Sequence, residues 1–181
     1  MKKTLLKVTA IFAMLIMSMF LLTGCGNNKK EDEKKDGIDE SNMTAPIEYA
    51  LKGLNDADGD AYLKALPALI VKEFNEKDIS DMKDSLNEYK NDRVETYGED
   101  VKITYEITEK EKMEDKDLKE LIEYLKTSYE DASKEELDFT EGYNCKVNFK
   151  IEGSKDSTTK TKSVSIYKIS GKWYIDDILL F

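Results

Sequence analysis

The sequence predicts an α+β fold in which N-terminal helices pack on a curved antiparallel sheet of about four strands. Apolar residues recur at helical spacing through the first half of the chain, up to about Tyr97. Alternating strand patterns follow, and the last three are joined by turn-like segments. One more helical pattern lies between the first and second strands, so we expect a helix inserted there. Helices are expected on one face of the sheet.

Two helices are expected at the start of the domain. Thr44 and Pro46 mark the beginning of the first helix. Its apolar residues fall on one face: Ile47, Leu51 and Leu54. Asp60 is the expected N-cap of the second helix, which Pro67 kinks or restarts.

A third helix and the first strand complete the first half of the domain. The helix is expected from about Ser80, as its cap, to Tyr97, with Gly98 as its stop. The strand is indicated by apolar residues that alternate with polar ones: Val101, Ile103, Tyr105 and Ile107. One face of this strand is therefore expected to be buried.

The second half of the domain combines the inserted helix with three strands. Asp115 is expected to cap the helix, whose apolar stripe comprises Leu118, Leu121, Ile122, Leu125 and Tyr129. The second strand carries an apolar face of Tyr143, Cys145, Val147, Phe149 and Ile151. A hairpin loop over 153–160 leads to the third strand at 162–169, and a tight turn at 170–171 leads to the fourth, from Lys172 onward.

The fourth strand changes phase along its length. Trp173 and Ile175 point to one face, and the next apolar residues are Ile178 and Leu180. The spacing of three residues from Ile175 to Ile178 would place the second pair on the opposite face of a regular strand. A bulge at Asp176–Asp177 would keep both pairs on the core face.

Residues 1–24 have the layout of a secretory signal peptide: lysines, an apolar run from Val8 to Leu22, and the small residue Gly24 before Cys25. The run of 15 residues is shorter than the roughly 20 that span a bilayer. The stretch Leu22–Cys25 resembles the lipobox of bacterial lipoproteins. The resemblance implies cleavage between Gly24 and Cys25 and a diacylglyceryl group on the Cys25 thiol. We therefore expect a lipid-anchored protein on the extracytoplasmic face of the cell membrane.

Residues 25–43 are expected to form a lipidated, charged and flexible tether, and residues 44–181 the folded domain. The tether carries ten charged residues between Lys29 and Glu40, with Ile38 as its one sizeable apolar residue before Met43. Such a segment buries too little apolar surface to offset the entropy of ordering it.

Composition excludes several classes of function. Removing the three lysines of the leader from the formal net charge of −10 leaves −13, which repels nucleic acid and anionic lipid headgroups. Attachment to the membrane therefore relies on the acyl chains at Cys25. The chain has no histidine, which excludes Ser-His-Asp and Cys-His catalysis. Beyond Cys25 only Cys145 remains, so no internal disulfide forms, and a buried inert thiol is expected.

Two groups of neighbouring carboxylates are candidate sites. The segment 56–60 begins like a calcium loop, but Ala61 and Pro67 replace the glycine and bidentate glutamate that such a loop requires. We predict a turn and helix cap there, with no metal and no cofactor. Asp176 and Asp177 are adjacent carboxylates that point to opposite faces of a strand unless a bulge turns one inward. No catalytic residue is assigned.

Aromatic side chains provide the remaining candidates. Four amphipathic residues are candidate pocket-lining residues: Tyr105, Tyr143, Tyr167 and Trp173. Tyr62 belongs to the same group, and the alternative for each is that it fills the core.

Three segments resemble the nuclear transport factor 2-like superfamily, which has a cystatin-like, cone-shaped fold: Asn55–Asp60, Tyr97–Val101 and Gly171–Ile178. The resemblance spans roughly Ala45 to Phe181. More narrowly, the chain is similar to small Gram-positive lipoproteins of unknown function with that fold. The resemblance implies a curved sheet wrapped around helices. The superfamily includes isomerases and dehydratases that use an acid inside the cone, but no catalytic motif transfers to this chain.

The leading hypothesis is a membrane-anchored, extracytoplasmic and non-enzymatic module of the cell envelope that binds a small ligand or an envelope protein. One alternative is a small cone-shaped enzyme of isomerase or dehydratase type that uses Asp176 or Asp177. Another is a purely structural protein of envelope or spore assembly.

Overall fold

The computed structural model describes residues 37–128 and 138–175, which belong to one compact unit, Lys35–Phe181. The predicted leader, cleavage site and lipidation site at Gly24 and Cys25 lie outside the described residues. So do Tyr129 and the predicted bulge at Asp176–Asp177 with the apolar positions that follow it.

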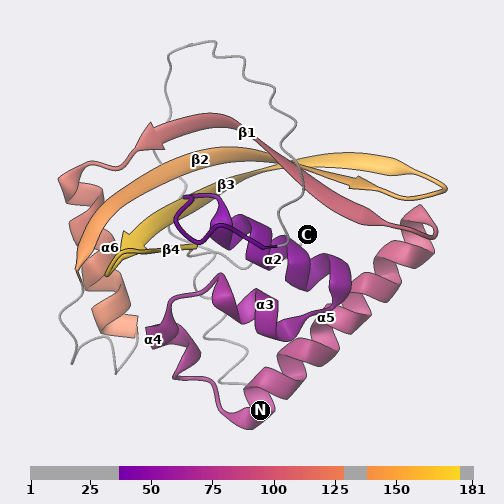
Figure 1. The fold of residues 1–181 in the computed structure, drawn as a ribbon, viewed down its shortest axis with the longest axis horizontal. Helices are drawn as coiled ribbons and strands as arrows, with labels where there is room; N and C mark the ends of the chain where they lie inside the picture. The colour runs from indigo at the N-terminus through magenta and orange to yellow at the C-terminus, as the bar shows by residue number, and fades with distance from the viewer. Residues whose placement is uncertain (1–36, 129–137, 176–181) are drawn as a thin grey trace. The chain divides into compact units, whose positions relative to one another are not determined.

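The predicted α+β class is confirmed (Figure 1). The described helices are α2 (Ala45–Asp56), α3 (Gly59–Lys64), α4 (Ala68–Val71), α5 (Glu76–Tyr97) and α6 (Asp115–Ser128). The strands are β1 (Lys102–Lys112), β2 (Phe139–Glu152), β3 (Ser157–Ile169) and β4 (Lys172–Ile175). They form one antiparallel sheet in the order β1-β2-β3-β4, and α6 follows β1 in the chain.

The first helix follows the prediction, and the second has a different cap. α2 begins after Thr44 with Pro46 in its first turn. At α3 the cap is Asp58, whose Oδ1 accepts a hydrogen bond of 3.0 Å from the Ala61 N–H. The prediction of Asp60 as cap was wrong, because Asp60 already lies in the first helical turn and pairs with Lys83 at 2.9 Å. After Pro67 the chain starts the separate short helix α4.

The prediction of Ser80 as the cap of the third helix was wrong, since α5 begins at Glu76. Asn75 accepts hydrogen bonds from the N–H groups of Lys77 and Asp78 at 2.9 and 3.0 Å. The Asp78 carboxylate accepts the Asn75 N–H at 3.1 Å, which completes a capping box. Asn75 has the extended backbone that a cap requires, whereas Ser80 lies inside the helix.

The hairpin between β2 and β3 is tighter than expected. β3 begins at Ser157, so the connection spans only 153–156, and the predicted loop to Lys160 and strand start at Lys162 were too late. Polar residues such as Thr158 and Thr159 join the ladder because Ile151 and Lys150 of β2 provide backbone partners for them. The turn at 170–171 is as predicted: both residues have positive φ, 49° and 84°, as a two-residue hairpin turn of type I′ requires.

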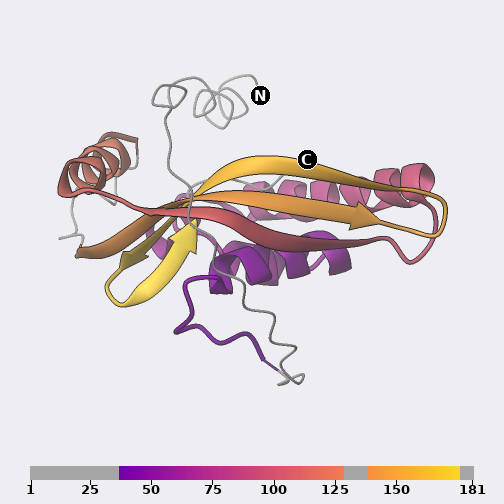
Figure 2. The ribbon, with the colours of Figure 1, turned by 90° about the horizontal axis from the view of Figure 1, so that it is seen from above.

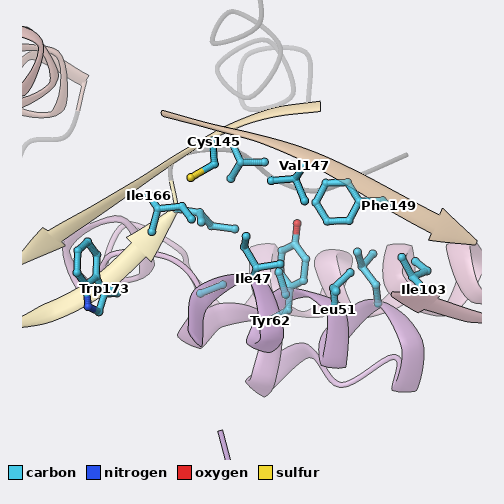
Figure 3. Close-up of a cluster of buried hydrophobic side chains, with 14 of the residues drawn as sticks. Ile47, Leu51, Tyr62, Ile103, Cys145, Val147, Phe149, Ile166 and Trp173 are labelled. Atoms are coloured by element: carbon cyan, nitrogen blue, oxygen red, sulfur yellow. The ribbon is translucent and has the colours of Figure 1, made fainter. Parts of the chain in front are cut away.

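The main core lies between the helices α2 and α3 and one face of the sheet (Figure 3). Helical side chains including Ile47 and Tyr62 face Val147 and Phe149 of β2, and none of the four is more than 2% exposed. The two helices approach closely at Gly53, where a Cβ atom would lie 2.6 Å from the Cβ of Tyr62. Glycine is therefore needed at this crossing.

A second core lies on the opposite face of the sheet. Ile166 belongs to the main core, whereas the next residue, Tyr167, packs with Leu125 of α6. Neighbouring residues of a strand point to opposite faces, and α6 lies across the sheet from α2 (Figure 2). The expectation that helices cover only one face was therefore wrong at this end of the sheet.

Candidate functional site

The four candidate pocket-lining residues do not surround one cavity. Tyr167 is fully buried in the second core, where its ring stacks on Phe139 with centroids 5.6 Å apart. Tyr105, Tyr143 and Trp173 contact the main core. Side chains of α2 and α3 fill the space beneath β2 that an open cone would leave for a ligand (Figure 3).

Tyr143 and Trp173 form an aromatic pair with ring centroids 6.0 Å apart. The ammonium of Lys110 lies 4.6 Å from the Tyr143 ring centroid, and that of Lys168 lies 5.2 Å from the Trp173 ring. Each ring thus has a cation of the chain over it, a favourable cation–π arrangement. Trp173 belongs to the main core, and Tyr143 packs against it.

Tyr105 forms a hydrogen-bonded cluster with α2. Its hydroxyl donates to Glu48 Oε1 at 3.1 Å, and the Thr44 hydroxyl donates to the same oxygen at 2.9 Å. Desolvation by burial raises the pKa of Tyr105 to about 12, because the phenolate would lose its hydration and lie near the Glu48 carboxylate.

We expect the Tyr105 hydroxyl to titrate at a higher pH than an ordinary tyrosine. An absorbance titration of phenolate formation should contain a component near pH 12 that Tyr105→Phe removes. The pKa is raised in the folded state, so the stability linked to this phenol is complete below about pH 10 and is lost as the pH rises toward 12. An unchanged high-pH component in the variant would contradict this assignment.

A groove of about 510 Å³ lies beside β4, and three segments distant in the sequence form its walls. Its lining is Glu40, Ala45, Tyr49, Leu63, Lys64, Leu66, Ala68, Val71, Lys72, Lys172, Trp173 and Tyr174. Most of the exposed wall is apolar, contributed by half-buried residues such as Tyr49, Leu63 and Tyr174. Of the candidate pocket-lining residues, Trp173 alone lines this groove.

Three hydrogen bonds hold the walls of the groove together. The Ile175 N–H donates to the Ala65 carbonyl at 3.1 Å, which ties β4 to the end of α3. The Trp173 indole donates to the Ser41 carbonyl at 3.2 Å. The Tyr49 hydroxyl donates to Glu40 at 2.8 Å. The groove is thus a built feature of the fold, and one of its walls includes Glu40 and Ser41, which were expected to belong to the flexible tether.

The groove has a positive rim. Among residues 37–128 and 138–175, the groove is lined by the lysines Lys64, Lys72 and Lys172 and by one carboxylate, that of Glu40. Lys64 extends over the Tyr49 ring, with its ammonium 5.4 Å from the centroid. This rim contrasts with the net charge of −10 of the whole chain.

A second cleft of about 650 Å³ lies between α2, α5 and the start of β1, and its lining is mostly polar. It contains three lysines and two aspartates, so its mixed charge favours neither anionic nor cationic ligands. Asn55 has a structural role there: its amide donates to the Ile103 carbonyl at 3.0 Å and accepts the Ile103 N–H at 2.8 Å. The Asn55 side-chain amide therefore bonds to the backbone at the edge of β1 in the way that a neighbouring strand would.

The aspartates of the calcium-like segment are directed to different partners. Asp58 caps α3 and pairs with Lys52 at 3.4 Å, and Asp60 pairs with Lys83. The hydrogen bond from the Ala61 N–H lowers the pKa of Asp58 below its usual value. Within the described residues no group of three or more His, Cys, Asp or Glu is arranged to hold a metal ion.

Cys145 is buried, with 2% exposure, in the main core. Burial raises the pKa of its thiol, which disfavours the reactive thiolate. This environment matches the prediction of a buried thiol. Asp176 and Asp177 lie outside the described residues. The hypothesis of an enzyme that uses one of them is therefore not tested by the structure and stays a hypothesis.

Comparisons with family models, characterised proteins and solved structures found no match to this chain. Among the described residues, no helix combines the length and apolar character needed to cross a membrane.

Proposed function

We propose that this chain is a membrane-anchored, extracytoplasmic lipoprotein and a non-enzymatic module that binds a partner protein of the cell envelope. The leader, the lipobox-like stretch ending at Cys25 and the charged tether support the anchor. The groove beside β4 supports the binding role. The relationship to the nuclear transport factor 2-like superfamily remains part of the proposal.

The groove favours a protein partner over a small ligand held inside the sheet. Core side chains such as Ile47, Tyr62 and Phe149 fill the space between the helices and the sheet. The groove lies instead along β4, an edge strand of the sheet. An apolar groove next to a strand edge is a common setting for peptide recognition.

The position of the groove suits a partner close to the membrane. Glu40 lines the groove and lies 15 residues after Cys25 in the sequence. At about 3.5 Å per residue, a fully extended tether would place the groove at most about 50 Å from the lipid-bearing residue. The partner is therefore expected to be another envelope protein within this reach.

Photo-crosslinking in cells tests the proposal. A benzoylphenylalanine at Ala68, an exposed position of the groove, should give a discrete crosslinked band with an envelope protein. The same residue at Lys119, exposed on α6 and outside the groove, is the control and should give no such band. Absence of a band at Ala68, or the same band at both positions, would argue against partner binding in the groove.

A further inference from the structure

We infer that the groove beside β4 binds an extended peptide in which an acidic residue lies next to a large apolar side chain. The inference rests on the proposed partner-binding function and specifies the chemistry of the partner. It is carried by the charge of the rim, the apolar wall and the direction of the β4 backbone.

The charge of the rim selects for acidic partners. Lys64 and Lys172 are exposed, and among the described lining residues they and Lys72 are lysines whereas Glu40 is the one carboxylate. A chain with a formal net charge of −10 would otherwise repel acidic segments. A concentration of lysines at this groove therefore makes it locally complementary to a carboxylate of the partner.

The wall between the lysines selects for an apolar side chain. Leu63, Val71 and Tyr174 are half-buried residues that line the groove. Covering this surface removes apolar area from water, which contributes roughly 25 cal/mol per Å² to binding before the costs of association. An aromatic or branched aliphatic side chain matches this wall.

The β4 backbone favours an extended peptide over a helix. The Ile175 N–H points away from β3, because it donates to Ala65 at 3.1 Å. In an antiparallel strand the backbone groups of alternate residues point to the same side. The N–H and C=O of Trp173 therefore also point away from β3, to the side of β4 on which Ala65 lies. An extended peptide beside this edge of β4 would pair with the N–H and C=O of Trp173, since the Ile175 N–H already donates to Ala65.

Peptide selection against the purified full chain in detergent tests the inference. The probe is a phage-displayed library of random dodecapeptides, and selected sequences are synthesised for affinity measurement. We expect enrichment of peptides with a net negative charge and at least one aromatic or branched aliphatic residue. Their affinity should fall as the salt concentration rises, because the lysines are exposed.

Charge reversal identifies the lysines responsible. The double variant Lys64→Glu with Lys172→Glu should weaken binding of a selected acidic peptide by about tenfold. Lys119→Glu makes the same type of charge change on the exposed surface of α6 and should leave the affinity within about twofold. Equal melting temperatures of the variants and the unmodified chain show that folding is retained.

Several outcomes would overturn the inference. Enriched peptides that are neutral or basic, or that bind the double variant and the unmodified chain equally, would refute the acidic chemistry and leave a partner-binding groove in place. No enrichment, together with no crosslink at Ala68, would refute the proposed function as well. A dimer that the double variant abolishes would assign the groove to a second copy, and binding seen only after removal of residues 176–181 would assign it to that segment.

Discussion

Cys25→Ser is expected to release this protein from the membrane. A serine hydroxyl does not accept the diacylglyceryl group that the lipobox-like stretch implies for Cys25. At about 0.8 kcal/mol per buried methylene, two long acyl chains contribute on the order of 20 kcal/mol to membrane attachment. Loss of the chains should therefore move the protein from almost entirely membrane-bound to almost entirely unbound. Metabolic labelling with palmitate and fractionation of cells would measure both effects.

Cys145→Ser is the matched control for this experiment. Cys145 is the second cysteine of the chain and is buried in the main core, so its replacement should leave palmitate incorporation unchanged. Palmitate incorporation into Cys25→Ser would contradict the predicted anchor. Mass spectrometry that finds residues 1–24 still attached to the mature protein would also contradict it.

Phe149→Ala is expected to destabilise the folded domain more than the replacement of any exposed aromatic residue. The Phe149 side chain has 0% exposure and packs against residues of α2 and α3 in the main core. Removing a buried phenylalanine side chain costs about 3–5 kcal/mol, from lost hydrophobic transfer and from the cavity left behind. For a domain of this size the melting temperature should fall by roughly 10 °C. Thermal unfolding followed by circular dichroism measures the change.

Tyr124→Ala provides the control for Phe149→Ala. Tyr124 is an aromatic residue on α6 with 39% exposure, so its replacement should change the free energy of unfolding by less than about 0.5 kcal/mol. A cost below about 1 kcal/mol for Phe149→Ala would show that Phe149 is not packed in the core as the structure has it.

Helix caps illustrate where sequence reasoning reaches its limit. Asn75 and Ser80 are both residues that cap helices well, and both precede apolar residues at helical spacing. Asn75 is the cap because Asp78, three residues later, returns a hydrogen bond to its backbone. This reciprocal pattern is present in the sequence, so a search for capping boxes would have found it. At α3 the cap is Asp58, whose backbone is extended, whereas Asp60, the cap expected from the sequence, lies in the first helical turn.

The buried Arg93 shows a role that helical periodicity did not reveal. Its guanidinium donates a hydrogen bond to the Leu54 carbonyl near the end of α2, and it is only 6% exposed. Desolvation by burial lowers its pKa below the usual value of arginine. A charged residue beside the apolar stripe of α5 would ordinarily be placed on the solvated face. Its burial follows from the contact between α5 and the end of α2, which are distant in the sequence.

The groove could not be predicted from the sequence for a similar reason. Its walls come from the start of the domain, from α3 and α4, and from β4, and none of these segments carries a local motif for binding. The sequence marks Trp173 as a candidate aromatic residue, but its neighbours in the groove come from α3 and α4, which lie beside β4 because the Ile175 N–H donates to the Ala65 carbonyl.

The sequence by itself determined the α+β class, the amphipathic helices α2 and α6, and the buried face of β2 from Tyr143 to Ile151. These follow from periods of 3.6 and 2 residues, which the local backbone geometry imposes on any buried face. Only the tertiary structure decided that α6 packs on the opposite face from α2, that Arg93 is buried and that a groove opens beside β4. An apolar stripe shows that a surface will be covered, whereas contacts between distant segments decide what covers it.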